Sequence, residues 1–341
     1  MDFFFQHLIS GFVFGMLFSF LMIMFSKRQN LIAYKNDRGL HELPTPTAGG
    51  MIFPFVFISS ILTELFIFKY VNISTDQIIF LFLYVFLFLG FFDDMFNLKA
   101  LSKLLFQTIT SISIITLYFS YKDLHFNSIE IIVFILAFSF LLFSVNTFNF
   151  LDGIDGFALS NAFFILIIFY FFSELSVEKY FILSLIGSVL ALFYFNIMKK
   201  IFIGDTGSLY LGSILGLLII DTIIFENMNK YILIIATSYW FSDVTITFFT
   251  RLFLVKKWYG THNMHPYQNL TKSLKTHKLT TLISILYNFL FLLPLIILTY
   301  QYPSFGIYFT VLGYLPSILF CLYYGPLKNL IFDKKTSSNE I

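Results

Sequence analysis

Apolar runs of about 20 residues alternate with short polar segments along nearly the whole chain. Runs of that length and composition are typical of helices that cross a lipid bilayer. The pattern predicts an all-α integral membrane protein, a polytopic bundle of about 11 transmembrane helices forming a single domain over 1–341. The predicted spans are roughly 3–25, 48–69, 77–92, 103–121, 128–145, 157–173, 180–196, 207–225, 231–252, 280–300 and 304–324.

The polar segments between these spans form two sets that alternate along the chain. The longer set carries 17 of the 21 Lys and Arg residues. By the positive-inside rule, this set is cytoplasmic, which places the N-terminus in the periplasm and the C-terminus in the cytoplasm. The longer segments are 26–47, 93–102, 146–156, 197–206, 253–279 and 325–341.

Composition agrees with a membrane protein, since 58% of the residues are hydrophobic and only 12% are charged. That balance excludes a soluble domain of this size. The first span has no basic start and no small-residue cleavage site, so we expect a retained helix and not a signal peptide. The single cysteine, Cys321, excludes an internal disulfide. Nothing in the sequence indicates a nucleic-acid partner, and a homodimer is compatible with it.

Three acidic clusters lie on the predicted cytoplasmic side, each where an apolar run ends. They are Asp93-Asp94, Asp152-Gly-Ile-Asp155 and Gly204-Asp205-Thr206-Gly207. Carboxylates at a membrane boundary are costly unless they pair, hydrate or hold a cation. Three of them on one side predict a divalent-metal site for a phosphorylated substrate.

Asp93 and Asp94 repel each other and need a cation or a proton at short range. With Mg²⁺ nearby, one carboxylate can bind the metal while the other orients or deprotonates a phosphate nucleophile. A hydrated helix end is the alternative. Lys103 and Gln107 follow at a spacing of four residues, where they either hold phosphate oxygens or anchor the helix at the interface.

The second cluster belongs to a run in which a polar residue recurs at every third position. If the run is the end of a helix, the four polar side chains share one face, and the following glycines let backbone approach a ligand. Amides and carboxylates in that arrangement suit a base, a ribose and a metal ion better than an ordinary turn. The four residues are Asn146, Asn149, Asp152 and Asp155.

The third cluster, with Asn196 upstream, has glycines on both sides of Asp205 just before a helix. This pattern predicts either an anion- or metal-binding turn at the helix N-terminus or a simple helix cap. His262 and His265 lie in segment 253–279, which we expect to be a cytoplasmic substrate loop, and they could share a helical face. No matching His or Cys set supports zinc. Asp243, in the ninth span, faces either the site or an interhelical partner.

These motifs, in this order, resemble the polyprenyl-phosphate N-acetylhexosamine-1-phosphate transferases of glycosyltransferase family 4, relatives of phospho-MurNAc-pentapeptide translocase. The likeness covers nearly the whole chain. It begins with the run from Arg38 and His41 through Pro44 to Gly49-Gly50, which by itself could be purely structural. It ends with Asp243, Arg251 and the His262-x-x-His265 loop.

The resemblance implies that undecaprenyl phosphate attacks a UDP-amino sugar, with Mg²⁺ (or Mn²⁺) as cofactor, and that UMP leaves. It also implies an active site on the cytoplasmic face of the bacterial inner membrane, built for a lipid-borne acceptor. The metal ligands would be Asp205 and Asp152. The catalytic group would be Asp93, Asp94, His262 and His265. The substrate contacts would be Arg38, His41, Lys103, Asn146, Asn149, Asp152, Asp155 and Asn196.

One departure concerns the sugar. Where the translocase has a histidine-rich signature, this chain has His265-Pro-Tyr-Gln, which resembles O-antigen or capsule initiators acting on deoxy amino sugars. A muropeptide or teichoic-acid substrate remains the alternative within the family. Two readings from other classes are a transporter, which would place polar groups at the bilayer midplane, and an inactive assembly scaffold.

Overall fold

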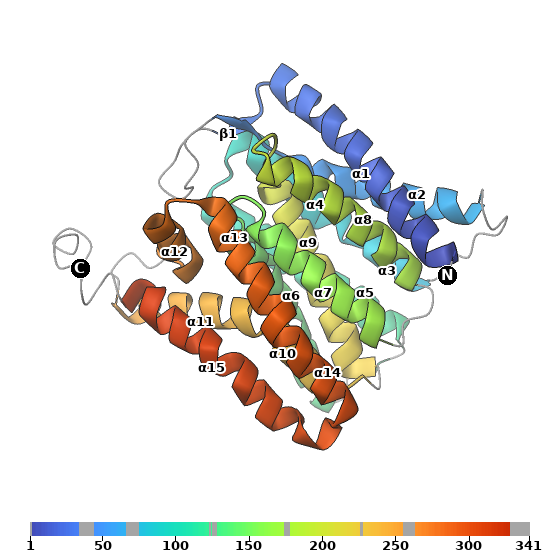
Figure 1. Cartoon of the computed structure of the whole chain (residues 1–341). Helices are drawn as coiled ribbons and strands as arrows, with labels where there is room; N and C mark the ends of the chain where they lie inside the picture. The colour runs from blue at the N-terminus through green and yellow to red at the C-terminus, as the bar shows by residue number, and fades with distance from the viewer. Residues whose placement is uncertain are drawn as a thin grey trace. The chain divides into compact units, whose positions relative to one another are not determined.

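The computed structural model describes residues 2–33, 44–65, 75–122, 124, 128–173, 178–225, 228–254 and 263–327, and the chain is largely helical (Figure 1). Each of the 11 predicted spans coincides with a helical segment. In these residues, eight helices are long and apolar enough to cross a membrane, and a ninth results if one bent pair counts as a single span. The all-α polytopic architecture is thus confirmed, while the count of 11 crossings and the orientation stay predictions.

Three predicted spans differ from simple long helices. The ninth is two helices bent by 62° at a short break. The second and the sixth coincide with shorter apolar helices, Gly49–Thr63 and Phe157–Phe172. Helices of that length cross a full hydrocarbon core less readily than 20-residue ones.

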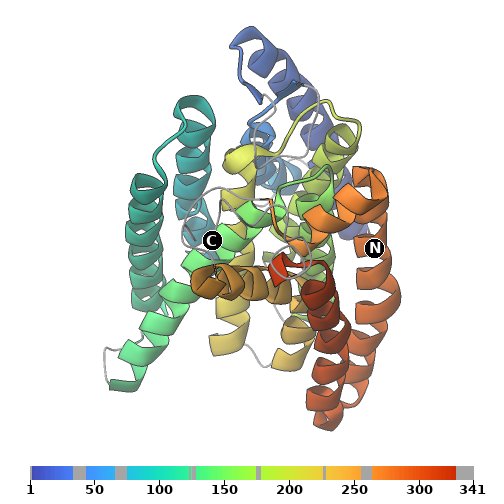
Figure 2. The same cartoon turned by 90° about the vertical axis from the view of Figure 1, so that its left-hand side faces the viewer.

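The helices group into two compact units, which are described separately. The first unit comprises the described residues within 1–33, 45–152 and 169–227. At its centre α9 packs between α4 and α6, and α1 packs along α8 (Figure 1). Figure 2 shows α4 and α5 as a neighbouring pair. The elements are α1 (Asp2–Arg28), β1 (Ile32–Ala33), β2 (Thr45–Pro46), η1 (Gly49–Ile52), α2 (Phe53–Thr63), α3 (Thr75–Phe82), α4 (Tyr84–Phe96), α5 (Ala100–Tyr121), α6 (Ser128–Leu151), α8 (Glu178–Ile197) and α9 (Gly204–Phe225).

The second unit comprises the described residues within 34–44, 153–168 and 228–341. In it α15 packs on α11, and α12 contacts both α13 and α15. Helix α7 (Phe157–Phe172) begins in this unit and ends in the first. The other elements are α10 (Lys230–Ala236), α11 (Ser238–Leu254), α12 (Pro266–Leu274), α13 (His277–Leu286), the π-helical segment η3 (Tyr287–Leu292), α14 (Leu293–Gln301), η4 (Pro303–Phe305) and α15 (Gly306–Tyr324).

The Pro- and Gly-rich segment before α2 supports the start of α9. Strands β1 and β2 form a short antiparallel pair. Beyond β2, the N–H groups of Gly49 and Gly50 donate to the carbonyls of Phe202 and Ile203, each at 2.9 Å. The described part of this motif therefore has a structural role, which is to hold the loop that leads into α9. Arg38 and His41, predicted to contact substrate, lie outside the described residues.

Candidate active site

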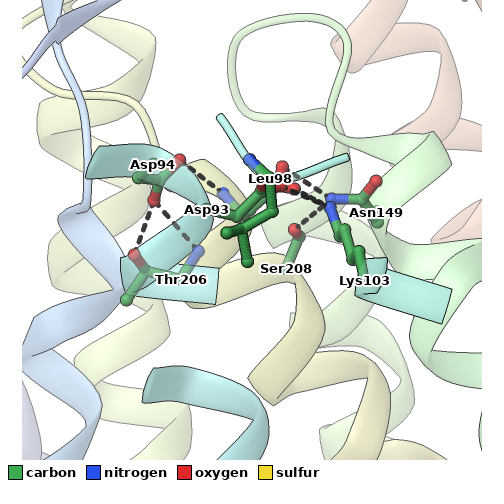
Figure 3. A network of polar contacts seen from close by, with 8 residues as sticks. Asp93, Asp94, Leu98, Lys103, Asn149, Thr206 and Ser208 are labelled. Atoms are coloured by element: carbon green, nitrogen blue, oxygen red, sulfur yellow. Dashed lines mark hydrogen bonds and ion pairs between the residues drawn. The ribbon is translucent and has the colours of Figure 1, made fainter. Parts of the chain in front are cut away.

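The candidate active site of the first unit lies where the ends of four helices meet. Asp93 is in the last turn of α4, Lys103 in the first turn of α5, Asn149 near the end of α6 and Asp205 in the first turn of α9. The predicted topology places all four ends on the same side. The structure thus joins the first and third acidic clusters through a lysine, Lys103, and an amide, Asn149 (Figure 3).

A tight turn brings Asp93 to Lys103. Helix α4 ends at Asn97, which has a left-handed backbone (φ 50°) and whose N–H donates to the Asp93 carbonyl at 2.8 Å. Helix α5 starts three residues later, so the chain reverses within one turn. Asp93 then accepts from the Leu98 N–H at 2.7 Å and from the Lys103 ammonium at 2.8 Å.

Lys103 joins two helices, because its ammonium also pairs with Asp205. The side chains of Lys103 and Asp93 are each 14% exposed and that of Asp205 is 23% exposed. The opposite oxygen of Asp205 accepts from the Asn149 amide at 2.8 Å, and the same amide donates to Ser208 at 3.1 Å. The cluster is therefore nearly dry, with one ammonium between two carboxylates from different helices.

Asp94 has a different environment from its neighbour Asp93. Its two oxygens accept from the backbone N–H groups of Asp205 and Thr206, both at 3.1 Å, and from the Thr206 hydroxyl at 2.5 Å (Figure 3). These are the unsatisfied donors of the first turn of α9. Asp94 thus caps this helix from α4, a geometry that favours a positioning role for this predicted catalytic residue.

Two glycines allow this cap to form. Helix α9 begins at Gly204, which has φ +70°, as the sequence predicted for a glycine turn before a helix. A Cβ on Gly90 of α4 would lie 2.2 Å from the Asp205 carbonyl oxygen. Close approach of α4 to α9 therefore depends on the absence of a side chain at Gly90.

Gln107 lies one turn beyond Lys103 on α5 and is 1% exposed. Neither its amide nitrogen nor its amide oxygen has a hydrogen-bond partner among the described residues. A buried amide without a partner is unusual in proteins and points to a bound group or ordered water. Of the two interpretations of Lys103 and Gln107, the geometry favours a ligand contact over an interface anchor.

The polar run at the end of α6 does not form one helical face. Asn146 and Asn149 are on the helix, which ends at Leu151, so Asp152 and Asp155 lie beyond it. The expectation of four residues on one face was wrong, because the glycines break the helix before the second half of the run. Asn146 donates to the Leu142 carbonyl of its own helix at 2.8 Å. Asp152 is half-buried directly after the helix.

Two other predicted substrate residues have partners inside their own units. Asn196 donates to the Ile201 carbonyl at 3.0 Å and so shapes the turn between α8 and α9. In the second unit, Asp155 is buried and contacts the Nδ1 atom of His277 at 2.8 Å. His277 opens α13, and no spacing pattern in the sequence indicated it. Ser208, which accepts from Asn149, was not named by the sequence analysis either, although it directly follows the third acidic cluster.

His265 and Asp243 form a buried pair in the second unit. The Nδ1 atom of His265 lies 2.6 Å from Asp243, which also accepts from Tyr239 at 3.2 Å and from Thr247 at 3.4 Å. Asp243 therefore faces the interior, as expected. His265 stands at the N-cap of α12 in an extended conformation, directly before the helix. His262 lies outside the described residues.

Around this loop, Lys272 supplies a positive charge. Its ammonium donates to the carbonyl of Asn263 at 2.7 Å and to the side chain of Asn263 at 2.9 Å. Partial burial lowers the pKa of Lys272. Gln268 accepts from the His265 N–H at 3.2 Å and fixes the start of α12.

Mg²⁺ in proteins is usually held by one or two carboxylates together with substrate phosphates. Asp93 and Asp205 offer such oxygen ligands. No group of three or more His, Cys, Asp or Glu side chains in the described residues is arranged to hold a metal ion by itself. The donor set therefore fits a metal shared with a phosphorylated substrate.

Comparisons with known proteins agree with this chemistry. A family model described as Glycosyl transferase family 4 matches residues 77–223, which include Asp93, Lys103, Asn149 and Asp205. The phospho-N-acetylmuramoyl-pentapeptide-transferase of Thermotoga petrophila is 30% identical over 217 residues, 58% of this chain and 68% of the relative. The same enzyme of Prochlorococcus marinus is 30% identical over 256 residues, which are 62% of this chain and 69% of the relative. The enzyme of Fervidobacterium nodosum is 32% identical over 223 residues, which are 60% of this chain and 70% of the relative.

Helical membrane segments, a carboxylate–lysine cluster at their ends and these relatives define a class: multi-pass membrane transferases. The chain belongs to glycosyl transferase family 4.

Proposed function

We propose that this protein transfers an N-acetylated amino-sugar-1-phosphate from a UDP-sugar to undecaprenyl phosphate and releases UMP. The reaction would initiate a cell-envelope polysaccharide such as an O-antigen or a capsule. The observation that carries the proposal is the Lys103 ammonium between Asp93 and Asp205, at helix ends that the charge pattern assigns to the cytoplasmic side of the bacterial inner membrane. A soluble nucleotide and a lipid-borne acceptor can both reach such a position.

The reaction is an in-line displacement at phosphorus. An oxygen of the lipid phosphate forms a bond to the β-phosphorus of the UDP-sugar, and the bond from that phosphorus to the bridging oxygen breaks, so that UMP carries the charge away. Phosphoryl transfer depends mainly on positioning and on neutralising phosphate oxygens. Lys103 supplies one fixed positive charge, and the amide nitrogen of Gln107, one turn away, is a donor for a phosphate oxygen.

Asp93 is the carboxylate that we assign to the nucleophile, since its contacts are one N–H and one ammonium and its oxygens remain at the cluster centre. Asp205 and Asp93 would hold Mg²⁺, which would supply charge neutralisation at the pyrophosphate, and the metal role predicted for Asp152 stays a prediction. Asp94 keeps Asp205 in place through the cap on α9. Asn149 orients Asp205 from the other side.

In the second unit, we assign His265 to a contact with the donor pyrophosphate or sugar and Asp155 to the nucleotide. Asp152, the last residue of its segment in the first unit, is also assigned to the nucleotide. The buried Asp243 fixes the ring orientation of His265. Asp155 is held in turn by His277. A hydrogen bond from a supporting residue holds the side chain that contacts substrate in the orientation that the transfer reaction requires.

A second candidate is a muropeptide donor, since the relatives cited above carry that substrate in their name. At about 30% identity the fold and the chemistry are shared more securely than the sugar pocket. Tyr267 and Gln268 stand directly after the His265-Pro266 step, and Lys272 binds Asn263, so this loop has its own polar pattern. The resemblance of the His265-Pro-Tyr-Gln run to O-antigen or capsule initiators is the ground on which we prefer a small amino sugar.

The test is UMP release by purified protein in detergent or nanodiscs with undecaprenyl phosphate and Mg²⁺. A panel of UDP-amino sugars should include UDP-N-acetylmuramoyl-pentapeptide. Release with one donor that stops with EDTA and with Asp205→Asn supports the proposal and names the sugar. Release with the muropeptide alone establishes the second candidate. No release from folded protein with any donor contradicts both.

A further inference from the structure

The second unit contains an apolar cavity of about 240 Å³, and Tyr239, which donates to Asp243, is one of its lining residues. For comparison, a dry cavity on the order of 150 Å³ is enough to bind benzene. Helices α11, α12, α13 and α15 and the start of α7 enclose it. The lining residues are Phe157, Tyr239, Tyr267, Leu270, Thr280, Ile283, Ser284, Tyr287, Pro316, Ser317 and Phe320.

The lining offers little to a polar ligand. Five of the six hydroxyls in it already take part in a hydrogen bond inside the unit, so the cavity presents mainly carbon. The bonds are Tyr239 to Asp243, Thr271 to Thr280, Asn161 to Ser284, Tyr287 to the Gly313 carbonyl, and Tyr287 with Ser317. An apolar occupant therefore gains burial without leaving a polar group unpaired.

Two of the segments that line the cavity have the length and composition of membrane spans. Segments 277–301 and 303–324 are both long and apolar enough to cross a bilayer. Ile283 is 40% exposed, and Pro316 and Phe320 are half-buried, so we take these three residues as the mouth of the cavity. Around them on the same helices, Leu282 and Leu290 are exposed apolar side chains. An apolar surface of this kind predicts hydrocarbon and not water at the mouth.

Both helices depart from regular α geometry beside the cavity. Tyr287 begins the π-helical segment of the α13–α14 rod, and Pro316 interrupts the backbone bonding of α15. π-helical turns widen a helix locally and are frequent at functional sites. A proline inside a helix removes one donor and bends the axis. The opening between these helices is therefore encoded in their sequences.

We propose that this cavity is a binding site for one acyl chain of a membrane phospholipid. The occupant must be apolar because of the lining, and it must come from the bilayer because of the mouth. Among the described residues, no cationic side chain lines the cavity to select a phosphate head. Mass action therefore favours the most abundant hydrocarbon chain in the membrane over a scarce polyprenyl chain.

Two of the tyrosines that line the cavity also contact the buried His265–Asp243 pair. Tyr239 lines the cavity with its ring and donates to Asp243 with its hydroxyl. The Tyr267 ring stacks on Phe157 at 4.5 Å and lies 5.8 Å from the His265 ring. A chain in the cavity packs against the rings that hold Asp243 and His265 in place.

The test uses the full-length protein in liposomes that contain a phospholipid with a diazirine on its acyl chain. After photolysis, mass spectrometry locates the label. We expect label on Tyr239 and Tyr267, which are buried from surrounding lipid, and on the exposed Leu290 as an internal reference. Ile283→Trp, which fills the mouth, should lower labelling of the two tyrosines about tenfold, equivalent to about 1.4 kcal/mol of binding, and leave Leu290 unchanged.

Leu282→Trp is the matched control, since Leu282 precedes Ile283 on α13, is 47% exposed and does not line the cavity. It should keep full labelling of the tyrosines. Label on Leu290 without label on the tyrosines would overturn the proposal. So would labelling of the tyrosines by a diazirine polyprenyl phosphate but not by the phospholipid probe, because the occupant would then be the prenyl chain.

Discussion

The carboxylate of Asp94 caps the helix whose first turn carries Asp205. Asp94 is on α4 and Asp205 is 111 residues away on α9, yet the Asp205 N–H donates to Asp94 at 3.1 Å. An anionic cap at a helix N-terminus satisfies free N–H groups and interacts favourably with the helix dipole. The two adjacent aspartates therefore have different roles. Asp94 caps α9, and Asp93 contacts Lys103 in the cluster.

This division predicts different effects of the two amide substitutions. Asp94→Asn keeps an oxygen acceptor, so it should lower thermal stability by about 0.5–2 kcal/mol and UMP release about tenfold. Asp93→Asn should lower release by about 10²–10⁴, the range of a group that acts on a proton, with little change in stability. Thermal unfolding and initial rates measure both.

Asp221→Asn is the control for the same helix. Asp221 lies near the other end of α9, where it pairs with Tyr118 and Lys122. This variant should lose stability and keep its rate per folded molecule. If Asp94→Asn were as inactive as Asp93→Asn with unchanged stability, Asp94 would be a catalytic group and not a positioning one.

Lys103 makes a second prediction, because it separates two carboxylates in a nearly dry site. Lys103→Met should lower UMP release by about 10²–10³, as for loss of a fixed group that stabilises transition-state charge. It also leaves Asp93 and Asp205 facing each other without a cation. Mg²⁺ should therefore raise the melting temperature of Lys103→Met more than that of the unchanged protein.

Lys103→Arg is the companion variant, since it keeps the charge but changes its geometry. Relative to Lys103→Met, Lys103→Arg should restore the thermal stability fully and the rate of UMP release only in part. Equal Mg²⁺ responses of the melting temperature in all three proteins would argue against Asp93 and Asp205 as metal ligands.

The sequence predicted the helical membrane architecture well, because apolar runs of bilayer length have few alternatives. It also placed Asp93, Lys103, Asn149 and Asp205 on one side, and the contacts among them bear that out. What it missed depends on tertiary contacts. The cap from Asp94 to α9 and the pairing of Asp155 with His277 join residues more than 100 positions apart.

The prediction from sequence was also limited by the places where helices end. A three-residue spacing looks like one helical face until a glycine ends the helix, and α6 ends before Asp152. The start of α12 is set in a similar way, since Pro266 begins the helix directly after His265. Helix ends are set by backbone conformations that the hydrophobic period does not report.

His265 provides a third prediction, on donor binding. His265→Gln removes a ring that Asp243 orients, so the proposed contact with the pyrophosphate or sugar is lost. We expect KM for the UDP-sugar to rise about tenfold, since one hydrogen bond to a charged group is worth roughly 1.5–3 kcal/mol, with KM for the lipid unchanged. His7→Gln, a buried histidine on α1 that stacks on Tyr180, is the control and should leave both KM values unchanged.

The acyl-chain site gives the last prediction, which rests on the proposed function as well. If a chain in the cavity holds Tyr239 and Tyr267 against the Asp243–His265 pair, then Ile283→Trp should disturb the same step as His265→Gln. We expect a rise of about threefold to tenfold in KM for the UDP-sugar, corresponding to about 0.7–1.4 kcal/mol, while Leu282→Trp leaves it unchanged. Delipidated protein should show the raised KM until phospholipid is added back, and the Ile283→Trp variant should not respond to that addition. Unchanged KM in an Ile283→Trp protein that has lost its tyrosine labelling would separate the two ideas: the chain would bind, but it would not support His265.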